Sequence, residues 1–196
     1  MTHQIVLLRH GVTQANEKWL YCGKTNLPLS QRGAEELREK RLQGGYPDVS
    51  GFAVYTSGML RTEQTLELLF GEVPHTAQPG LREVSFGEFE MHSYEELKLR
   101  PDYQAWITGD NEKNVPPGGE SGEQMKARVF ECFDRLLKDS KNILIVAHGG
   151  PVAALMARLF PGEARTRYEW QPRGGEGYEI LLDNQQPVSW KKLPDR

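Results

Sequence analysis

Residues 4–11 read QIVLLRHG, and residues 142–150 read NILIVAHGG. Each stretch is a short apolar run that ends in a histidine followed by glycine. The first predicts a strand over residues 4–8. The second predicts a strand over residues 142–147, and its continuous apolar character is typical of a strand buried on both faces of a parallel sheet. We therefore expect His10 and His148 to lie at the ends of two strands.

Predicted helices alternate with predicted strands along the rest of the chain. The expected helices cover residues 34–42, 60–70, 93–100, 121–137 and 151–160, and the further strands cover residues 52–55, 178–182 and 187–193. Residues 101–119 are rich in Asp, Asn, Pro and Gly, which predicts an irregular surface excursion that could lean over a site. The pattern favours an α/β fold, a three-layer α/β/α sandwich around a mostly parallel sheet.

The length and the composition predict one globular domain over residues 1–196, with a small cap around residues 84–120. Hydrophobic residues make up 38% and charged residues 26%, and the formal charge of −3 gives no whole-chain basic field for nucleic acid or an anionic membrane. No secretion signal and no membrane-spanning run is visible. With only Cys22 and Cys132 for disulfides, we expect a cytoplasmic protein.

Polar residues that suit a phosphate dianion follow the predicted strands. Arg9 and His10 follow the first strand, Arg61 begins the helix after the second, Glu83 follows a turn, and His148 follows the late buried strand. In a parallel sheet these positions meet at the carboxyl edge, where ligands bind. Guanidinium groups make paired hydrogen bonds to phosphate oxygens, and a neutral imidazole can attack phosphorus. The pattern predicts phosphoryl chemistry.

The sequence resembles the histidine phosphatase superfamily, which includes cofactor-dependent phosphoglycerate mutases and α-ribazole phosphatases. The resemblance lies in five segments that occur in the family's order. They are Arg9-His10-Gly11 with Thr13, Asn16 and Gly23, then SGMLRTEQT (57–65), LRE (81–83), PGGES (117–121) and VAHGG (146–150). It implies a phosphoglycerate mutase-like fold and a histidine acid-type phosphatase that hydrolyses phosphate monoesters through a phosphohistidine.

Carried over position by position, the resemblance implies a role for each matched residue. His10 would be the nucleophile, Glu83 the proton donor and then the base, and Arg9, Arg61 and His148 would bind the phosphoryl group. Further residues of the phosphate pocket would be Gly11, Thr13, Asn16, Cys22, Gly23 and Gly149. No cluster of Asp or His has the spacing of metal ligands, so we expect neither a metal nor a cofactor.

The segment after the acid distinguishes branches of the family. Glu83 is followed by VSFGEF (residues 84–89), without the Arg and Tyr groups that hold the substrate carboxylate in phosphoglycerate mutases. It is similar to the phosphatase branch, which includes the α-ribazole phosphatases. Two alternatives stay open: a phosphoglycerate mutase that needs 2,3-bisphosphoglycerate, and a non-catalytic module that binds phospholigands.

The expected ligand is a small phosphorylated metabolite. Phe86, Phe89, Tyr103 and Trp106 could give the site an aromatic rim, which would favour a substrate larger than a triose.

Overall fold

A six-stranded sheet forms the centre of the computed structural model, which describes residues 2–110, 112–139 and 142–195. The strand order is β3-β2-β4-β1-β5-β6. The strands are β1 (Thr2–Arg9), β2 (Ala53–Thr56), β3 (Thr76–Ala77), β4 (Ile143–Ala147), β5 (Gly177–Asp183) and β6 (Gln186–Leu193). The first four strands of this order pair in parallel, and β5 and β6 join antiparallel at one edge. The mostly parallel sheet predicted from the sequence is confirmed.

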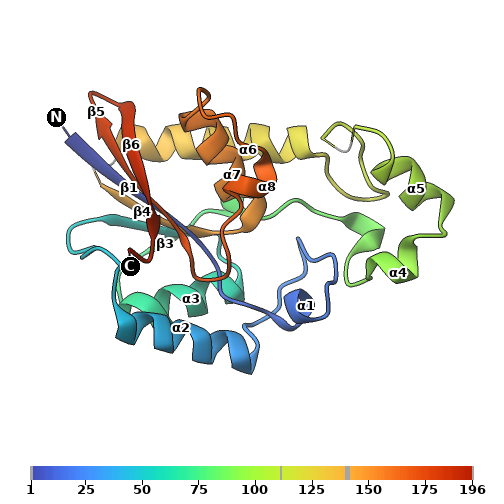
Figure 1. The fold of residues 1–196 in the computed structure, drawn as a ribbon, viewed down its shortest axis with the longest axis horizontal. Helices are drawn as coiled ribbons and strands as arrows, with labels where there is room; N and C mark the ends of the chain where they lie inside the picture. Colours follow the sequence, from blue (N-terminus) through green and yellow to red (C-terminus); the bar gives the residue numbers. More distant parts are fainter. Residues whose placement is uncertain (1, 111, 140–141, 196) are drawn as a thin grey trace.

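Side chains alternate between two cores along β1. Ile5 and Leu7 lie in a core with α6 (Gly122–Asp139) and α7 (Gly149–Leu159), whereas Val6 and Leu8 lie in a core with α2 (Gln31–Gln43) and α3 (Leu60–Phe70). Figure 1 shows the two helix pairs on opposite faces of the sheet. All four side chains are buried, because a central strand of a covered sheet has no solvated face. The three-layer α/β/α architecture follows from this alternation.

The predicted helices with clear apolar periodicity are present. α3 covers residues 60–70 as expected, and α6 extends the predicted helix by two residues. The helix expected over 34–42 begins earlier because Ser30 caps it, with its hydroxyl accepting from the Gly33 N–H. The helix expected over 151–160 begins directly after His148. These two helices therefore start closer to the carboxyl edge of the sheet than predicted.

The prediction for residues 93–119 is wrong in two respects. The expected helix over 93–100 is only one short turn, α4 (Tyr94–Leu97), and the stretch expected to be irregular contains α5 (Pro101–Ile107). Pro101 occupies the start of α5, where its missing N–H removes no helical hydrogen bond. The proline therefore begins a helix as well as ending the preceding turn.

Several short elements were not predicted. Among them are α1 (Gln14–Glu17), α8 (Arg167–Trp170) and β3, each too short to show a periodic pattern. Thr13 and Thr166 cap the two helices with hydrogen bonds to the backbone three residues on. Capping residues, rather than hydrophobic spacing, define these turns.

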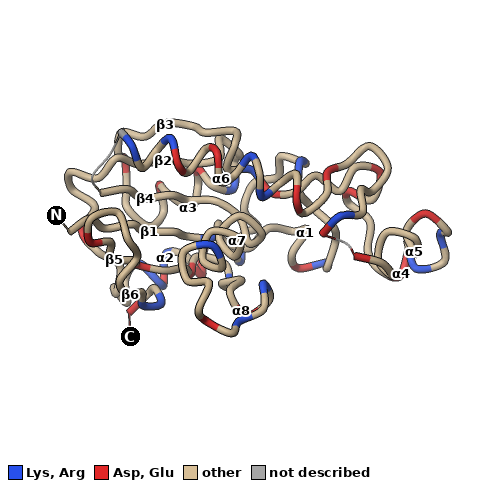
Figure 2. The backbone as a smooth tube through the Cα atoms, turned by 90° about the horizontal axis from the view of Figure 1, so that it is seen from above, with Lys and Arg blue, Asp and Glu red and all other residues tan. Residues whose placement is uncertain are grey.

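The segment from residue 84 to residue 120 forms an arm at one end of the molecule, away from β5 and β6, in both views (Figures 1 and 2). Phe89, Leu97 and Tyr103 make a small separate core there, and Tyr21 packs against it from the loop after α1. Figure 2 shows basic and acidic positions interspersed along the chain. Among the described residues, no helix is both long and apolar enough to cross a membrane.

Candidate active site

The two histidines lie side by side because their strands pair. Arg9 and Ala147 are partners in the β1–β4 ladder, and the His10 N–H donates to the Ala147 carbonyl at 3.0 Å. The imidazole centroids of His10 and His148 lie 5.1 Å apart in an edge-on arrangement. Both side chains are buried. The sheet register therefore brings together two histidines that lie far apart in the sequence.

Arg61 reaches the pair from the first turn of α3. Its Nε donates to His148 Nδ1 at 3.3 Å, and its Nη1 and Nη2 donate to the Thr25 and Gly23 carbonyls, both at 2.8 Å. The side chain is only 1% exposed. A guanidinium has five N–H donors, and these three bonds leave two of them for an anion. Arg61 is thus a fixed cation beside both imidazoles.

Arg9 and Glu83 complete the cluster predicted from the sequence. Arg9 donates to the Pro172 carbonyl at 2.9 Å, and the Glu83 carboxylate accepts from the Gly150 N–H at 3.0 Å and from the Val84 N–H at 3.0 Å. Gly150 lies in the first turn of α7, directly after the His148-Gly149 pair. The structure therefore brings Glu83 to the end of the same strand that carries His148.

Burial and neighbouring charges keep His10 neutral. Burial is the main cause that lowers the pKa of His10 well below the usual 6.5, and the charges of Arg61 and Arg9 lower it further. The Nδ1 atom lies 2.6 Å from the Gly11 carbonyl, which can only accept, so Nδ1 carries the proton. The Nε2 atom then keeps its lone pair. A neutral imidazole with a free lone pair is the form that attacks phosphorus.

Hydrogen bonds also define the tautomer of His148. Since the Arg61 guanidinium can only donate, His148 Nδ1 accepts and Nε2 carries the proton, which is donated to the Ser57 hydroxyl at 2.8 Å. Burial, then His10 and the arginines, lower the pKa of His148 well below 6.5. Ser57 in turn lies 3.1 Å from the Thr62 hydroxyl. His148 is therefore a neutral ring with both nitrogens held.

The two glycines after the histidines have different environments. The Gly11 N–H donates to the Thr65 hydroxyl at 2.9 Å, so this amide already has a partner. Gly149 is the first residue of α7, and a Cβ there would lie 2.3 Å from the Gln171 side-chain nitrogen. The N–H groups at a helix start are suited to an anion. The amide of Gly149 remains the better placed of the two predicted contacts.

Four other predicted pocket residues mainly contact other residues of the protein. Thr13 is buried and caps α1, and Asn16 Oδ1 accepts from its N–H and its hydroxyl at 3.0 Å each. Burial raises the pKa of the Cys22 thiol, and its sulfur lies 3.7 Å from the Thr25 carbonyl. Gly23 gives its carbonyl to Arg61. Direct phosphate contact by these residues stays a prediction.

Glu90 is a structurally important residue that the sequence did not single out. Its carboxylate accepts from the N–H groups of Gly23, Lys24 and Thr25 at 2.9 to 3.2 Å, and from the Phe86 N–H at 3.0 Å. The same loop supplies the two carbonyls that hold Arg61. Glu90 thus orders the loop beneath the cation. A single Glu in an acidic stretch gives no sequence signal for such a role.

Two cavities adjoin the cluster. One, of about 880 Å³, contains Glu83 and Gly150 in its wall, and the other, of about 910 Å³, contains Arg9, His10 and Asn16. Three residues line both cavities: Tyr21, Tyr168 and Gln171. We call the first the Glu83 cavity and the second the His10 cavity. Arg9 and His10 thus line one cavity and Glu83 lines the other.

The Glu83 cavity is largely apolar. Its apolar and aromatic lining consists of Tyr21, Val84, Phe86, Trp106, Ile107, Met125, Phe130, Ala153, Ala154, Ala157 and Tyr168. Of the four aromatic residues expected at a rim, Phe86 and Trp106 line this cavity. The expectation is wrong for Phe89 and Tyr103, whose side chains are fully buried because they form the small core of the arm.

Among the described residues, no three or more His, Cys, Asp or Glu side chains form a group that could hold a metal ion. The cations beside the imidazoles are instead the two arginines. Independence from metal stays a prediction for experiment.

Comparison with known proteins supports the pattern of the site. The family model for the histidine phosphatase superfamily (branch 1) matches residues 5–189. The chain is 33% identical to the adenosylcobalamin/alpha-ribazole phosphatase of Escherichia coli K12, over 97% of this chain and 95% of the relative. It is also 30% identical to a 2,3-bisphosphoglycerate-dependent phosphoglycerate mutase of Methylobacterium radiotolerans, over 81% and 80% of the two chains.

Solved structures give the same two groups. The alpha-ribazole phosphatase of Shigella flexneri superposes with a TM-score of 0.83 at 30% identity, covering 94% of this chain and 93% of the other. A phosphoglycerate mutase from Thermus thermophilus superposes with a TM-score of 0.69 at 28% identity, covering 95% and 97%. Of these two structures, the phosphatase is the more similar.

Proposed function

The chain belongs to the histidine phosphatase superfamily and is a phosphatase, and from this premise we propose that it hydrolyses phosphate monoesters through a phosphohistidine on His10. The observation that carries the proposal is the buried, neutral His10 beside two fixed arginines. Each feature favours attack on a phosphate dianion. Arg9 and Arg61 attract the dianion, and the lowered pKa of His10 keeps the lone pair of Nε2 available.

In the first step, His10 Nε2 forms a bond to phosphorus while the bond from phosphorus to the ester oxygen breaks. Glu83 donates a proton to the departing oxygen. Arg9 and Arg61 bind the phosphoryl oxygens, on which negative charge is spread during transfer. His148 would join them by donating its Nε2–H to phosphate in place of the Ser57 hydroxyl. The products of this step are the free alcohol and phosphohistidine.

In the second step, water attacks phosphorus and the bond to His10 breaks. Glu83, now a carboxylate, accepts a proton from the water. Inorganic phosphate leaves, and His10 and Glu83 return to their starting protonation states. No step needs an electron acceptor or donor.

We propose that the leaving alcohol occupies the Glu83 cavity and carries a ring. The proton donor lines this cavity, so the alcohol must depart toward it, and the apolar lining includes Phe86, Trp106 and Phe130. Aromatic side chains pack favourably against planar rings. The relatives named alpha-ribazole phosphatases make α-ribazole 5′-phosphate the first ester to test.

The test is phosphate release in the presence of a chelator from α-ribazole 5′-phosphate, glycerol 3-phosphate and p-nitrophenyl phosphate. We expect release that His10→Ala abolishes, with the ring-bearing esters preferred, and that survives in His92→Ala, which changes an exposed histidine of the cap. Trapped protein should carry an acid-labile phosphoryl group only when His10 is present. Release that persists in His10→Ala would contradict the proposed nucleophile.

Phosphoglycerate mutase activity is the second candidate, because relatives of that name are also similar over most of the chain. Isomerisation of 3-phosphoglycerate with 2,3-bisphosphoglycerate, without net phosphate release, would favour it. Binding of the esters without turnover would instead favour a phospholigand-binding module.

A further inference from the structure

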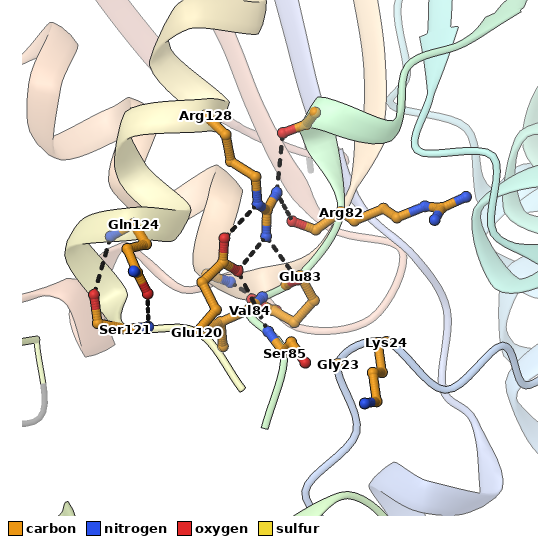
Figure 3. A network of polar contacts seen from close by, with 12 residues as sticks. Gly23, Lys24, Arg82, Glu83, Val84, Ser85, Glu120, Ser121, Gln124 and Arg128 are labelled. Carbon is orange, nitrogen blue, oxygen red and sulfur yellow. Dashed lines mark hydrogen bonds and ion pairs between the residues drawn. The ribbon is translucent and has the colours of Figure 1, made fainter. Parts of the chain in front are cut away.

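Arg128 on α6 uses all its hydrogen-bond donors on the segment that carries Glu83 and on Glu120 (Figure 3). Its Nε and Nη2 donate to the two carboxylate oxygens of Glu120, each at 2.7 Å. Its Nη1 donates to the Gly80 and Arg82 carbonyls at 3.0 and 2.7 Å, and Nη2 donates to the Glu83 carbonyl at 2.8 Å. These contacts account for all five N–H donors of a guanidinium.

Glu120 contacts the same segment on the other side of Glu83, at Ser85. Its backbone N–H donates to the Ser85 carbonyl at 2.9 Å, and its side chain accepts weakly from the Ser85 N–H at 3.4 Å. Arg128 and Glu120 together therefore hold the chain on both sides of Glu83. We call this pair the Arg128 clamp.

The clamp connects an irregular segment to a rigid part of the core. Residues 82–86 form no helix or strand, so no regular element of their own fixes the Glu83 backbone from which the Val84 and Gly150 N–H groups hold the carboxylate. Arg128 precedes Val129, which is fully buried against the sheet, and α6 runs 18 residues. Through Arg128, the segment that carries Glu83 is held at a fixed position relative to the sheet that carries His10.

We propose that Arg128, with Glu120, is a positioning residue that holds Glu83 in reach of the ester oxygen during proton transfer. This inference rests on the proposed function of Glu83. General acid catalysis needs the donor within hydrogen-bond distance of the oxygen that it protonates, and a displacement of about 1 Å can reduce the rate about 100-fold. Lysine cannot replace the clamp, because one ammonium group has three donors and no planar fork.

If the Arg128 clamp only stabilises the fold, its loss should lower kcat/KM equally for all esters. If the clamp positions Glu83, the loss should depend on the leaving group of the ester. An alkoxide such as that of glycerol is strongly basic and needs a proton to leave, whereas p-nitrophenolate leaves without one. The value of kcat/KM covers the steps up to phosphohistidine, so it reports the departure of the alcohol. A displaced Glu83 should affect only the ester whose leaving group needs the proton.

The experiment compares kcat/KM of wild type, Arg128→Lys and Glu120→Gln for glycerol 3-phosphate and p-nitrophenyl phosphate. We expect Arg128→Lys to lower the value for glycerol 3-phosphate roughly 10- to 100-fold and to change the value for p-nitrophenyl phosphate by less than about threefold. Arg135→Lys, about two turns further along α6 and exposed, is the matched control and should change neither.

Equal losses with both esters, or no loss with either, would overturn the inference. If Arg128→Lys does not fold, Glu120→Gln decides the question, because it weakens the clamp without removing Arg128 and should show the same selective loss to a smaller extent. Wild-type protein that hydrolyses neither ester would instead refute the proposed function.

Discussion

The side of the site that we propose binds phosphate differs sharply from the side proposed to face the leaving group. His10, Arg61 and His148 are buried, and each has hydrogen-bond partners that fix its orientation. The Glu83 cavity, by contrast, is a large space with mostly apolar walls. In the proposed mechanism the two sides have separate roles: the buried side acts on the phosphate common to all esters, and the cavity distinguishes one alcohol from another.

The largest expected effect comes from Glu83→Gln, which leaves the phosphate-binding side intact. Loss of the general acid should lower kcat/KM for alkyl phosphates by about 10²- to 10⁴-fold, with a much smaller effect on p-nitrophenyl phosphate. Steady-state hydrolysis of both esters measures the ratio. A similar loss with both would show that Glu83 also serves phosphate binding, and the division would break down.

Arg61→Lys changes the phosphate-binding side. Lysine keeps the charge but cannot make the three bonds to His148, Thr25 and Gly23, so the fixed donors toward the phosphate are lost. We expect kcat/KM to fall by about 10²- to 10³-fold, equally for alkyl and nitrophenyl esters. Arg135→Lys is again the control. A loss confined to one ester would contradict the separation of the two sides.

Ala157→Trp narrows the Glu83 cavity and leaves the residues around His10 unchanged. Ala157 lines the Glu83 cavity on α7 and is exposed, so the larger side chain can enter the cavity without disrupting the core. Steric exclusion at a cost of about 1–3 kcal/mol should lower kcat/KM for α-ribazole 5′-phosphate roughly 10- to 100-fold while glycerol 3-phosphate is unaffected. Ala157→Ser controls for the position. Unchanged selectivity would place the ring outside this cavity.

The smallest expected effect concerns stability. The folded-state pKa values of His10 and His148 are lowered, so below the usual 6.5 the unfolded chain binds protons that the folded chain does not. The free energy of unfolding should therefore fall as the pH decreases below about 6.5, with each histidine contributing up to about 1.4 kcal/mol per pH unit.

Urea unfolding followed by circular dichroism between about pH 7 and pH 5 tests this expectation. His148→Gln should make the stability less dependent on pH. His92→Gln, at an exposed position of the arm, is the control. An undiminished slope in His148→Gln would contradict the contribution of His148 to the acid sensitivity.

The sequence predicted the parts of the fold and site that strong local patterns specify. The two buried strands and the amphipathic helix α6 follow from hydrophobic runs and spacing, and the strand ends placed His10 and His148 together. The five-segment resemblance supplied the expected partners Arg61 and Glu83. These residues do converge, although the role of each is still to be measured.

Contacts between distant polar groups could not be predicted in the same way. Glu90 accepts hydrogen bonds from backbone N–H groups that lie 65 to 67 residues earlier in the chain. Arg128 donates hydrogen bonds to backbone carbonyls that lie 45 to 48 residues earlier. Backbone acceptors and donors have no residue identity, so no pattern of side chains marks them. For the same reason the amide of Gly11 was expected to face phosphate, whereas Thr65 accepts its hydrogen bond.

At Gly23, the loop beneath Arg61 packs closely against the chain beside Glu83, and this close approach leaves no room for a side chain. A Cβ at this position would lie 1.7 Å from the Val84 carbonyl oxygen, so the loop beneath Arg61 rests directly against the chain beside Glu83. An insertion in the loop beneath Arg61 or in the chain beside Glu83 would move Arg61 away from Glu83. The three atoms nearest to that Cβ belong to Val84 and Glu90, in the first part of the 84–120 segment. Changes of substrate over evolutionary time should therefore accumulate in the rest of this segment while the spacing of the chemical groups is preserved.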